Sequence, residues 1–389
     1  METVYMDHSA TTPVRPEVVE AMLPYFEEKY GNASSVHHKG REAREAVEDA
    51  RRTVAAHLGA APDEIVFTSG GTESDNHAIR GVAAAAGERG RHIITSAIEH
   101  HAVLNTCKDL EKEGFEVTTL PVDDRGLVDP RDLDDAMRPD TILVTVMMAN
   151  NEVGTIEPIR ELAEVASEHD VPIHTDAVQA VGKIPVDVEE LGVDLLSLSG
   201  HKFYGPKGVG VLYIRSGTRI RPVQVGGHHE KGRCAGTENV PGIVGLARAL
   251  ELACAEMEGE GQRLRRLRDH LQEGLAGSLE DARLNGHPER RLPHILNITF
   301  AYVEGESMLL SLDAAGICVS TGSACTSGTL EPSHVLTAMG VPAEMAHGSL
   351  RFSLGRVNDE KDVEYVLEKL PPIVRRLREM SPITRETPA

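Results

Sequence analysis

Short apolar runs alternate with helix-period segments through the first two thirds of the chain, and this alternation restricts the fold more than any other feature. The runs are at most seven residues long and rich in leucine or β-branched residues, which predicts buried strands. They lie at residues 64–68, 92–96, 141–147, 171–175 and 194–199. Between them stand helical patterns such as 41–59, which ends on Gly59. We therefore predict βαβ units, and hence an α/β fold whose mostly parallel sheet is covered on both faces.

The pattern changes in the last third of the chain. A long charged helix is predicted over residues 251–275. It is followed by an apolar strand at 295–300, a helix from about Glu306, a strand around Arg351 and a last helix from about Asp359. This mixture predicts a smaller α+β domain, joined to the larger one by the long helix.

Charge and cysteine usage argue against several classes of protein. The net charge of −21 argues against nucleic-acid binding, because phosphate binding depends on clustered Lys and Arg. The longest strongly apolar run, residues 142–149, is far shorter than the ~20 residues of a membrane span. The N-terminus also lacks the features of a secretory signal. Five cysteines without a C-x-x-C pair predict reduced thiols, a cytoplasmic protein and no resident metal site.

Ligands of parallel sheets bind at the carboxyl ends of the strands, so the residues there are the first candidates for chemistry. After the run at 64–68, Gly70 and Gly71 precede Thr72, a candidate helix N-cap. A strand, a glycine turn and a helix N-terminus form a candidate anion site from backbone N–H groups. The alternative is a helix that is simply well capped.

Asp176 and Lys202 follow two further strands. A buried carboxylate is costly unless it meets a cation or several donors, although Asp176 alone would more simply cap the next helix. Lys202 lies where desolvation lowers the pKa of an amine, as a Schiff-base lysine requires. The segment is not a P-loop, because Gly205 is followed by Pro206 and Lys207. An anion cradle, an Asp and a Lys on one sheet match the phosphate, the pyridinium nitrogen and the aldehyde of pyridoxal 5′-phosphate.

Other polar residues extend this candidate site. His100 and His101 follow the strand at 92–96, and the sequence does not decide which of them stacks on the cofactor ring. Asn150 and Asn151 follow the next strand and are candidate donors to the ring hydroxyl oxygen. Arg351 is a candidate bidentate clamp for a substrate carboxylate, the alternative being an arginine in a surface salt bridge.

Cys325 stands in "STGSACTSGTLEPSHV", residues 320–335, among small residues that cannot pack a core. No second cysteine lies close enough to suggest a metal clip. A thiol on such a tether is suited to enter a cofactor site and later to reach an acceptor outside it.

These motifs, together with "DHSATTP", "EHHAVL" and "NNEVGTI", run nearly end to end. The chain resembles the cysteine desulfurases of the NifS/IscS type, among the class V aminotransferase-like, fold-type I pyridoxal-phosphate enzymes. "SGHKFYGPKGVG" carries the resemblance for the cofactor lysine, and the cysteine loop carries it for the desulfurase branch. The resemblance implies a seven-stranded large sheet and a smaller α+β domain. On it we place the large domain at residues 15–255, and the small domain with the cysteine loop at residues 1–14 and 256–389.

The resemblance also implies a role for each residue that matches a family motif. Lys202 is the Schiff-base lysine, Cys325 the nucleophile and His100 the residue that stacks on the ring and transfers protons. Thr237 is supplied by the second subunit of a homodimer, and the substrate carboxylate is bound by Asn32 and Arg351. The implied cofactor-binding set is Gly71, Thr72, His100, Asn151, Asp176, Gln179, Ser199, His201, Lys202 and Thr237.

The implied reaction removes the sulfur of L-cysteine with pyridoxal 5′-phosphate as cofactor, leaving L-alanine and a persulfide on Cys325. The implied partners are a second copy of the chain and an IscU-type iron–sulfur scaffold protein or another sulfur acceptor such as a tRNA-thiolation factor. Direct contact with nucleic acid or membrane is not expected. In a scaffold complex Cys325 is also a candidate ligand for an iron–sulfur cluster.

Three alternatives share many of these residues: a selenocysteine lyase, another pyridoxal-phosphate enzyme, and a non-catalytic platform for iron–sulfur assembly. A transaminase has no use for a thiol on a long loop, and a platform has no use for an intact Lys202. One departure from the family concerns "CAGT", where the family usually has Arg-Ser-Gly-Thr. Cys234 therefore stands at the arginine position and adds a second thiol near the cofactor.

Overall fold

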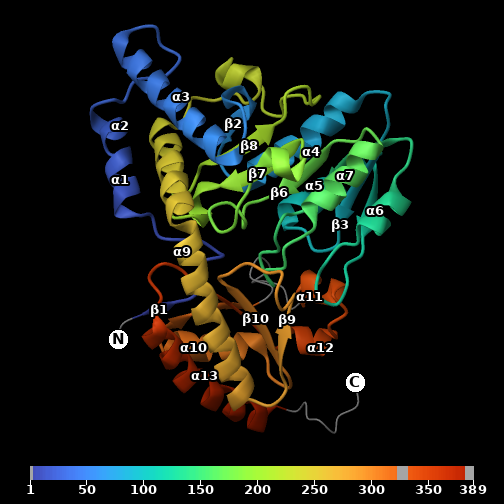
Figure 1. Ribbon diagram of the computed structural model, residues 1–389, viewed down its shortest axis with the longest axis vertical. Helices are drawn as coiled ribbons and strands as arrows, with labels where there is room; N and C mark the ends of the chain where they lie inside the picture. The colour runs from blue at the N-terminus through green and yellow to red at the C-terminus, as the bar shows by residue number, and fades with distance from the viewer. Residues whose placement is uncertain (1–2, 322–331, 382–389) are drawn as a thin grey trace.

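The computed structural model describes residues 3–321 and 332–381, and its elements form two lobes (Figure 1). The large lobe is built on a seven-stranded sheet, and the small lobe on a four-stranded sheet with an additional strand pair. Helix α9 (Val240–Ser278) runs from one lobe into the other. Cys325, the predicted nucleophile, lies outside the described residues.

The large sheet has the strand order β2-β8-β7-β6-β5-β3-β4. All neighbouring pairs are parallel except those of β8, which is antiparallel to both β2 and β7. The predicted mostly parallel sheet is therefore confirmed. The strands are β2 (Ile65–Thr68), β3 (His92–Ser96), β4 (Glu116–Leu120), β5 (Thr141–Thr145), β6 (Ile173–Asp176), β7 (Leu195–Ser199) and β8 (Gly210–Ile214).

Two strands of this sheet were not among the five predicted runs. Strand β4 forms one edge of the sheet, and only Leu120 of its five side chains is buried, so it lacks a continuous apolar run. Strand β8 is fully buried, but it follows the lysine loop directly instead of following a helix. The sequence around β8 therefore lacks the alternation of strand and helix patterns by which the five other strands were predicted.

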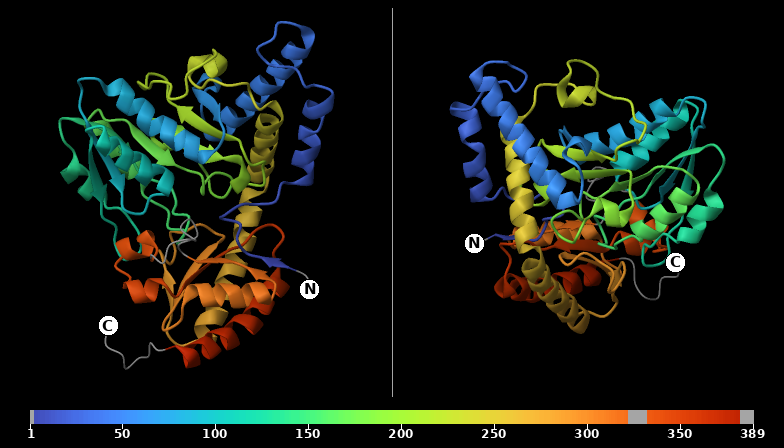
Figure 2. Two further views of the ribbon diagram at one scale, coloured as in Figure 1. Left: turned by 180° about the vertical axis from the view of Figure 1, so that it is seen from behind. Right: turned by 45° about the horizontal axis from the view of Figure 1, so that its top comes forward.

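Helices cover both faces of the large sheet, as Figure 2 shows. One apolar core contains Ile94, Val144 and Leu196, and the other contains the preceding residues of the same strands, Ile93, Leu143 and Leu195. This alternation follows from the pleat, which points successive side chains to opposite faces. The helices of this lobe are α1 (Pro16–Met22), α2 (Pro24–Glu27), α3 (His38–Leu58), α4 (Gly71–Ala86), α5 (His101–Lys112), α6 (Pro130–Ala136), α7 (Ile159–Glu168) and α8 (Val188–Leu191), with 3-10 turns at Pro62–Glu64, Gly200–Lys202 and His229–Gly232.

Two helix ends test the sequence reading directly. Helix α3 ends at Gly59, whose φ of 70° gives the left-handed cap that the sequence predicted. Helix α4 begins at Gly71 with Gly70 as its N-cap, so the prediction that Thr72 is the N-cap was wrong. Gly70 has a φ of 152°, a conformation that side-chain-bearing residues rarely adopt, and this glycine turns the chain into the helix before Thr72 is reached.

The small lobe holds an antiparallel sheet of order β12-β13-β10-β9 and a separate parallel pair, β1 with β11. Its apolar core joins the sheet to α10 and α13, which lie together in Figure 2. The elements are β1 (Val4–Tyr5), β9 (Ala282–Asn285), β10 (Ile295–Phe300), α10 (Gly305–Ala314), β11 (Ile317–Cys318), β12 (Ser320–Thr321), α11 (His334–Ala338), α12 (Ala343–Ala346), β13 (Ser349–Ser353) and α13 (Glu360–Met380).

Helix α9 contributes to the cores of both lobes. Its first half places Ile243 and Leu250 in the core of the large lobe, and its second half places Leu264 and Leu271 in the core of the small lobe. The predicted domain division after residue 255 falls inside this helix and stays a prediction. Among the described residues, no helix combines the length and the apolar character needed to cross a membrane.

Candidate active site

A cavity of about 320 Å³ lies at the carboxyl ends of the large sheet's parallel strands. It brings together predicted residues that are up to 280 positions apart in the chain, from Gly71 to Arg351. Asn32 and Thr237 do not line it. Its wall consists of Ser9, Ala10, Gly71, Thr72, Asp75, His100, Met147, Ala149, Asn151, Asp176, Val178, Gln179, Ser199, His201, Lys202 and Arg351.

One end of the cavity is the N-terminus of α4, where backbone N–H groups have no partner within the helix. A Cβ atom on Gly71 would lie 2.7 Å from Cγ2 of Val178, so a larger residue here would displace that side chain, which lies two residues after β6. The hydroxyls of Thr72 and Ser199 and the ring of His201 line the same region. This set of donors at a helix N-terminus fits a phosphate group.

Lys202 ends the 3-10 turn that follows β7, and its amine is held by the N-terminal segment of the chain. The Nζ atom donates to the carbonyl oxygens of Ser9 at 2.6 Å and Ala10 at 2.9 Å. The neighbouring His201 has its Nδ1 3.1 Å from the hydroxyl oxygen of Thr11. Residues 9–11 therefore position the lysine at the cavity wall.

Asp176 is the last residue of β6 and is 6% exposed. Its Oδ1 accepts from the backbone N–H of Val178 at 2.9 Å. Burial raises the pKa of this carboxyl to about 6, although the Val178 N–H and the charge of Lys202 act in the opposite direction. Such a carboxylate gains from a cationic partner, and a protonated pyridine nitrogen is one.

His100 is the N-cap of α5, and its Nδ1 accepts from the backbone N–H of Ala102 at 3.1 Å. Burial, together with the charges of Lys202 and His101, lowers the pKa of His100 to about 4. The ring is therefore neutral near pH 7, and because Nδ1 accepts a hydrogen bond, its proton is on Nε2. His100 lines the cavity and His101 does not, which favours His100 as the stacking residue.

The two predicted amide residues, Gln179 and Asn151, both line the cavity, and each is hydrogen-bonded to a different part of the chain. Gln179 is 7% exposed, and its Nε2 donates to the carbonyl oxygen of Ser9 at 3.0 Å. The backbone carbonyl of Asn151 accepts from Nη1 of Arg351 at 2.9 Å. Their predicted contact with a ring hydroxyl stays a prediction.

Arg351 lies on β13 in the small lobe and is 2% exposed, which excludes the alternative of a surface salt bridge. Its Nη2 donates to Oδ1 of Asp7 at 2.8 Å, so the guanidinium joins both lobes and the N-terminal segment. Its Nε is buried and lacks a hydrogen-bond partner among the described residues. An unsatisfied buried donor is costly, and a substrate carboxylate would satisfy it.

Two residues near the end of the segment 320–335, Ser333 and His334, contact the large lobe beside the cavity. Ser333 caps α11 and donates its hydroxyl proton to the buried carboxylate of Glu152. Nε2 of His334 lies 2.9 Å from the carbonyl oxygen of Glu99, and its ring is 4.9 Å from that of His101. This end of the predicted loop therefore starts next to the turn that carries His100.

The remaining predicted residues lie at the surface. Asn32 is exposed, and its Oδ1 accepts from the backbone and the hydroxyl of Ser34. Thr237 is exposed in the segment before α9. Cys234, three residues earlier, is buried and donates its thiol hydrogen to Glu73 in the first turn of α4.

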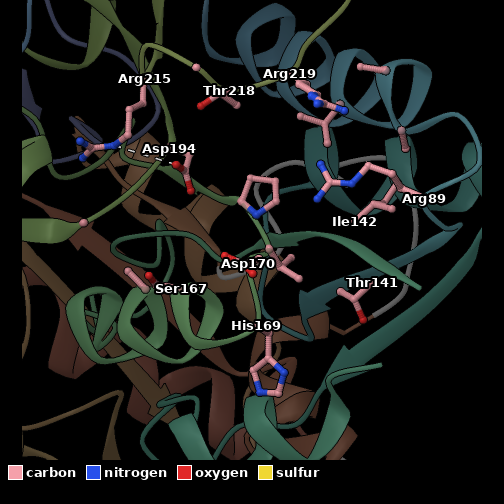
Figure 3. Close-up of a pocket in the computed structure, with 18 of the residues that line it drawn as sticks. Arg89, Thr141, Ile142, Ser167, His169, Asp170, Asp194, Arg215, Thr218 and Arg219 are labelled. Carbon is pink, nitrogen blue, oxygen red and sulfur yellow. Dashed lines mark ion pairs between the residues drawn. The ribbon is translucent and has the colours of Figure 1, made fainter. Parts of the chain in front are cut away.

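A second hollow, of about 1280 Å³, lies at the amino ends of the parallel strands of the large sheet, opposite the cavity (Figure 3). Thr141 starts β5, Asp194 precedes β7, and both line this hollow. Figure 3 shows Arg89 and Arg219 on one side of it and the ion pair of Asp194 with Arg215 on the other. None of the sequence-predicted site residues lines it.

Sequence reasoning missed Asp7, the partner of Arg351, and two parts of the cavity wall: the carbonyls of Ser9 and Ala10, and Asp75. The motif "DHSATTP" was noticed only as part of a resemblance, although its polar residues at the start of the chain were a signal. Within the part of the chain that the structure describes, no group of three or more His, Cys, Asp or Glu side chains is placed to hold a metal ion.

Comparison with known proteins identifies the family of this fold. The family model described as aminotransferase class-V matches residues 4–366. The chain belongs to the aminotransferase class-V family. The chain is 60% identical to a "Cysteine desulfurase IscS" of Methanosarcina thermophila over 98% of its own length and 95% of that protein. It is 58% identical to the protein of the same name from Dictyoglomus turgidum, covering 98% of this chain and 97% of the other.

The solved structures agree with this assignment. A "NIFS-LIKE PROTEIN" superposes with a TM-score of 0.92 at 44% identity, covering 97% of this chain and all of the other. The family resemblance, the fold-type I α/β class and pyridoxal 5′-phosphate as cofactor are thus confirmed. The cavity fits this cofactor, because it offers a helix N-terminus at one end, an amine on its wall and a buried carboxylate beside them.

Proposed function

We propose that this chain takes sulfur from L-cysteine onto Cys325 and releases L-alanine. The observation that carries the proposal is the single cavity that Lys202, Asp176, His100 and Arg351 line together. Relatives at 58% and 60% identity that are named cysteine desulfurase confirm the predicted enzyme class. The individual roles below deepen that assignment and are our own.

Pyridoxal 5′-phosphate, when bound, supplies an electron sink that weakens the carbon–sulfur bond of the substrate. The amine of Lys202 binds the cofactor and takes the α-proton of cysteine. Its support is its location on the cavity wall, where the carbonyls of Ser9 and Ala10 hold Nζ in place. Asp176 stabilises the cofactor nitrogen in its protonated form.

His100 stacks on the cofactor ring and holds a transferable proton on Nε2. Support comes from its place in the cavity wall and from its lowered pKa, about 4, which keeps the ring neutral near pH 7. A neutral imidazole gives or takes a proton at Nε2 without leaving its hydrogen bond to Ala102.

Arg351 binds the carboxylate of cysteine. The contacts with Asp7 and the carbonyl of Asn151 fix the plane of the guanidinium, and the buried Nε supplies a donor that still needs an acceptor. Asn32 is a second candidate for this carboxylate; it is exposed and does not line the cavity.

The sulfur step needs no further reactant. The thiolate of Cys325 attacks the sulfur of cysteine, a sulfur–sulfur bond forms, and the carbon–sulfur bond breaks. The Cβ carbon gains a proton, so cysteine plus the Cys325 thiol gives alanine plus a Cys325 persulfide. The persulfide sulfur then passes to an acceptor, for which an iron–sulfur scaffold protein or a tRNA-thiolation factor is our proposal.

A homodimer is part of the proposal. Large apolar side chains are exposed at one end of the large lobe, including Phe26 at 59%, Tyr30 at 68% and Val36 at 83%. Exposed apolar surface of this kind favours a covering partner, and a second copy would also bring Thr237 to the neighbouring cofactor. We also place the enzyme in the cytoplasm, since the four described cysteines are free thiols.

The test compares wild-type protein with Lys202→Ala and Cys325→Ala. Wild-type protein should be yellow and form alanine and, with reductant, sulfide from L-cysteine. Lys202→Ala should lose the yellow absorbance and at least about a thousandfold in rate, as removal of a covalent catalyst does. Cys325→Ala should keep the absorbance and lose sulfide release. Full sulfide release by Cys325→Ala would overturn the nucleophile assignment, and faster turnover of selenocysteine than of cysteine would favour the lyase.

A further inference from the structure

A second buried carboxylate, Asp75, lies beside Asp176, and the mechanism above does not use it. Asp75 is on the second turn of α4, is 1% exposed and lines the same cavity as Asp176. Its Oδ1 is buried and has no hydrogen-bond partner among the described residues. A buried ionised carboxylate without donors is costly, so the protonation state of Asp75 matters for the whole site.

Asp75 lies over a row of polar side chains on otherwise apolar strands. Thr145 is paired with His174, and Asp176 is paired with Ser197, so these side chains share one face of β5, β6 and β7. Nδ1 of His174 is 2.8 Å from the hydroxyl oxygen of Thr145, and its Nε2 is 3.0 Å from that of Ser197. All of these groups except Asp176, which is 6% exposed, are completely buried.

The hydrogen bonds of this row can be arranged in two ways, which differ in the nitrogen of His174 that carries the proton. Burial lowers the pKa of His174 to about 3, so its ring is neutral and has one N–H. With the proton on Nε2, His174 donates to Ser197, and Ser197 donates to an ionised Asp75. With the proton on Nδ1, His174 donates to Thr145 and accepts from Ser197. Ser197 then cannot also donate to Asp75, so a buried Asp75 is favoured in its protonated form.

The surrounding charges select the second arrangement. The ionisable groups that face Asp75 are Asp176, Glu99 and the neutral His174, which lies 3.7 Å away. The nearby cation, Lys202, acts on Asp176. Burial and the charges of Asp176 and Glu99 raise the pKa of Asp75 well above its ordinary value, although the hydroxyl of Ser197 acts in the opposite direction. Carboxylates this close together in a buried site do not all ionise, and Asp176 has the closer donor and cation.

We propose that Asp75 carries a proton in the resting enzyme and is a positioning residue for Asp176, keeping a single negative charge beneath the cofactor nitrogen. The proposal rests on the proposed function for the identity of the group that Asp176 meets. A neutral Asp75 orients His174 and Ser197 beside Asp176 without adding a charge that would compete for the proton of the cofactor.

The first test measures the thermal stability of the cofactor-free full chain between pH 5 and pH 8, for wild type, Asp75→Asn and the exposed control Asp124→Asn. Asn imitates a protonated Asp in both the folded and unfolded chain. The unfolded wild type loses a proton that the folded wild type keeps, so its stability falls with rising pH. The unfolding equilibrium constant of wild type relative to Asp75→Asn should rise about tenfold per pH unit. A ratio that does not change with pH would show an ionised Asp75 and overturn the proposal.

The second test measures cofactor affinity near pH 7.5. Asp75→Asn should bind pyridoxal 5′-phosphate within about threefold of wild type, whereas Asp176→Asn should bind at least about a hundredfold more weakly. Equal losses in the two variants would overturn the proposal. Because neither readout uses desulfurase activity, an inactive protein that passed both tests would refute the proposed function and leave the role of Asp75 standing.

A third measurement can be made on wild-type protein alone, so it does not depend on whether a variant folds. Infrared spectra of wild-type protein with ¹³C-labelled aspartate should contain a protonated carboxyl band at pH 8, where Asp176 is ionised. Absence of that band would overturn the proposal. Loss of the band in Asp75→Asn, where that variant folds, would assign it to Asp75.

Discussion

The amino ends and the carboxyl ends of the parallel strands, here called the amino edge and the carboxyl edge of the large sheet, each carry a hollow, and the two hollows differ in the polar groups that line them. The hollow at the amino edge has a volume of about 1280 Å³, against about 320 Å³ for the cavity at the carboxyl edge. Yet Arg89 and Arg219 of the larger hollow are exposed, and its Arg215 already contacts Glu189 at 2.8 Å. The smaller cavity holds buried carboxylates, an amine and a guanidinium with an unsatisfied Nε. Buried polar groups that still need partners, and not volume, mark the candidate active site.

Two aspartates show the same contrast. Asp194, at the amino edge, is partly exposed; its Oδ2 accepts from the backbone N–H of Ile173 at 2.9 Å, and Arg215 lies beside it. Asp176, at the carboxyl end of the neighbouring strand β6, is buried with one backbone donor. Asp194 therefore has its partners within the fold, whereas Asp176 is left for a ligand. The experiments below compare matched positions at the two edges.

The largest difference is expected between Asp176→Asn and Asp194→Asn. Removing the charge that faces the cofactor nitrogen should weaken cofactor binding by at least about a hundredfold, as for other buried charge pairs. Asp194→Asn should change cofactor affinity by less than about twofold, because it lies at the opposite edge. Titration of cofactor-free protein by absorbance measures both values. Similar losses at the two positions would remove the functional distinction between the edges.

The two arginines should differ next. Arg351→Gln should raise KM for cysteine by about tenfold to a hundredfold, the value of a charge-assisted hydrogen bond, because the substrate carboxylate loses its clamp. Arg219→Gln replaces an exposed guanidinium and should leave KM and kcat unchanged within about twofold. Steady-state alanine formation measures both constants. An unchanged KM in Arg351→Gln would assign the carboxylate to another residue, with Asn32 the first candidate.

The smallest effect concerns stability in acid. The buried His100 has a pKa lowered to about 4, while the unfolded chain binds a proton near pH 6.5. Stability should therefore fall as pH drops from 6.5 toward 4, by about 1 kcal/mol at pH 5.5 for this histidine. His100→Gln should flatten the dependence by that amount, and the exposed control His169→Gln should not. Denaturant unfolding at pH 7.5 and pH 5.5 measures it, and an identical slope in both variants would contradict the low pKa of His100.

The sequence predicted best where local pattern and tertiary structure agree. The strand at 92–96 has the predicted bounds, and α3 ends at the predicted Gly59, because apolar runs and glycine caps act within a few residues. Lys202, Asp176 and His100 line one cavity since each follows a strand of one sheet. The carboxyl-edge rule was enough to group them without any knowledge of distances.

Most of the missed features are contacts between segments that are far apart in the chain. Nothing near Asp7 indicates that its partner is Arg351, 344 positions later. Asp75 was not predicted as a site residue, because its burial against His174 depends on how α4 lies across the sheet. Thr72 was misplaced as an N-cap since the unusual φ of Gly70 is a property of the folded turn. The roles of Thr237 and Cys325 still rest on the resemblance.

The attachment of residues 4–11 also has a consequence for biosynthesis. Strand β1 is synthesised more than 300 residues before its pairing strand β11, and Asp7 is synthesised 344 residues before its partner Arg351. The large sheet can form while these early residues have no place to pack. The carbonyls that hold Lys202 are then placed only after β11 and Arg351 have been synthesised, so the catalytic amine is fixed late. Nascent chains should thus acquire cofactor-binding competence late, well after most of their secondary structure.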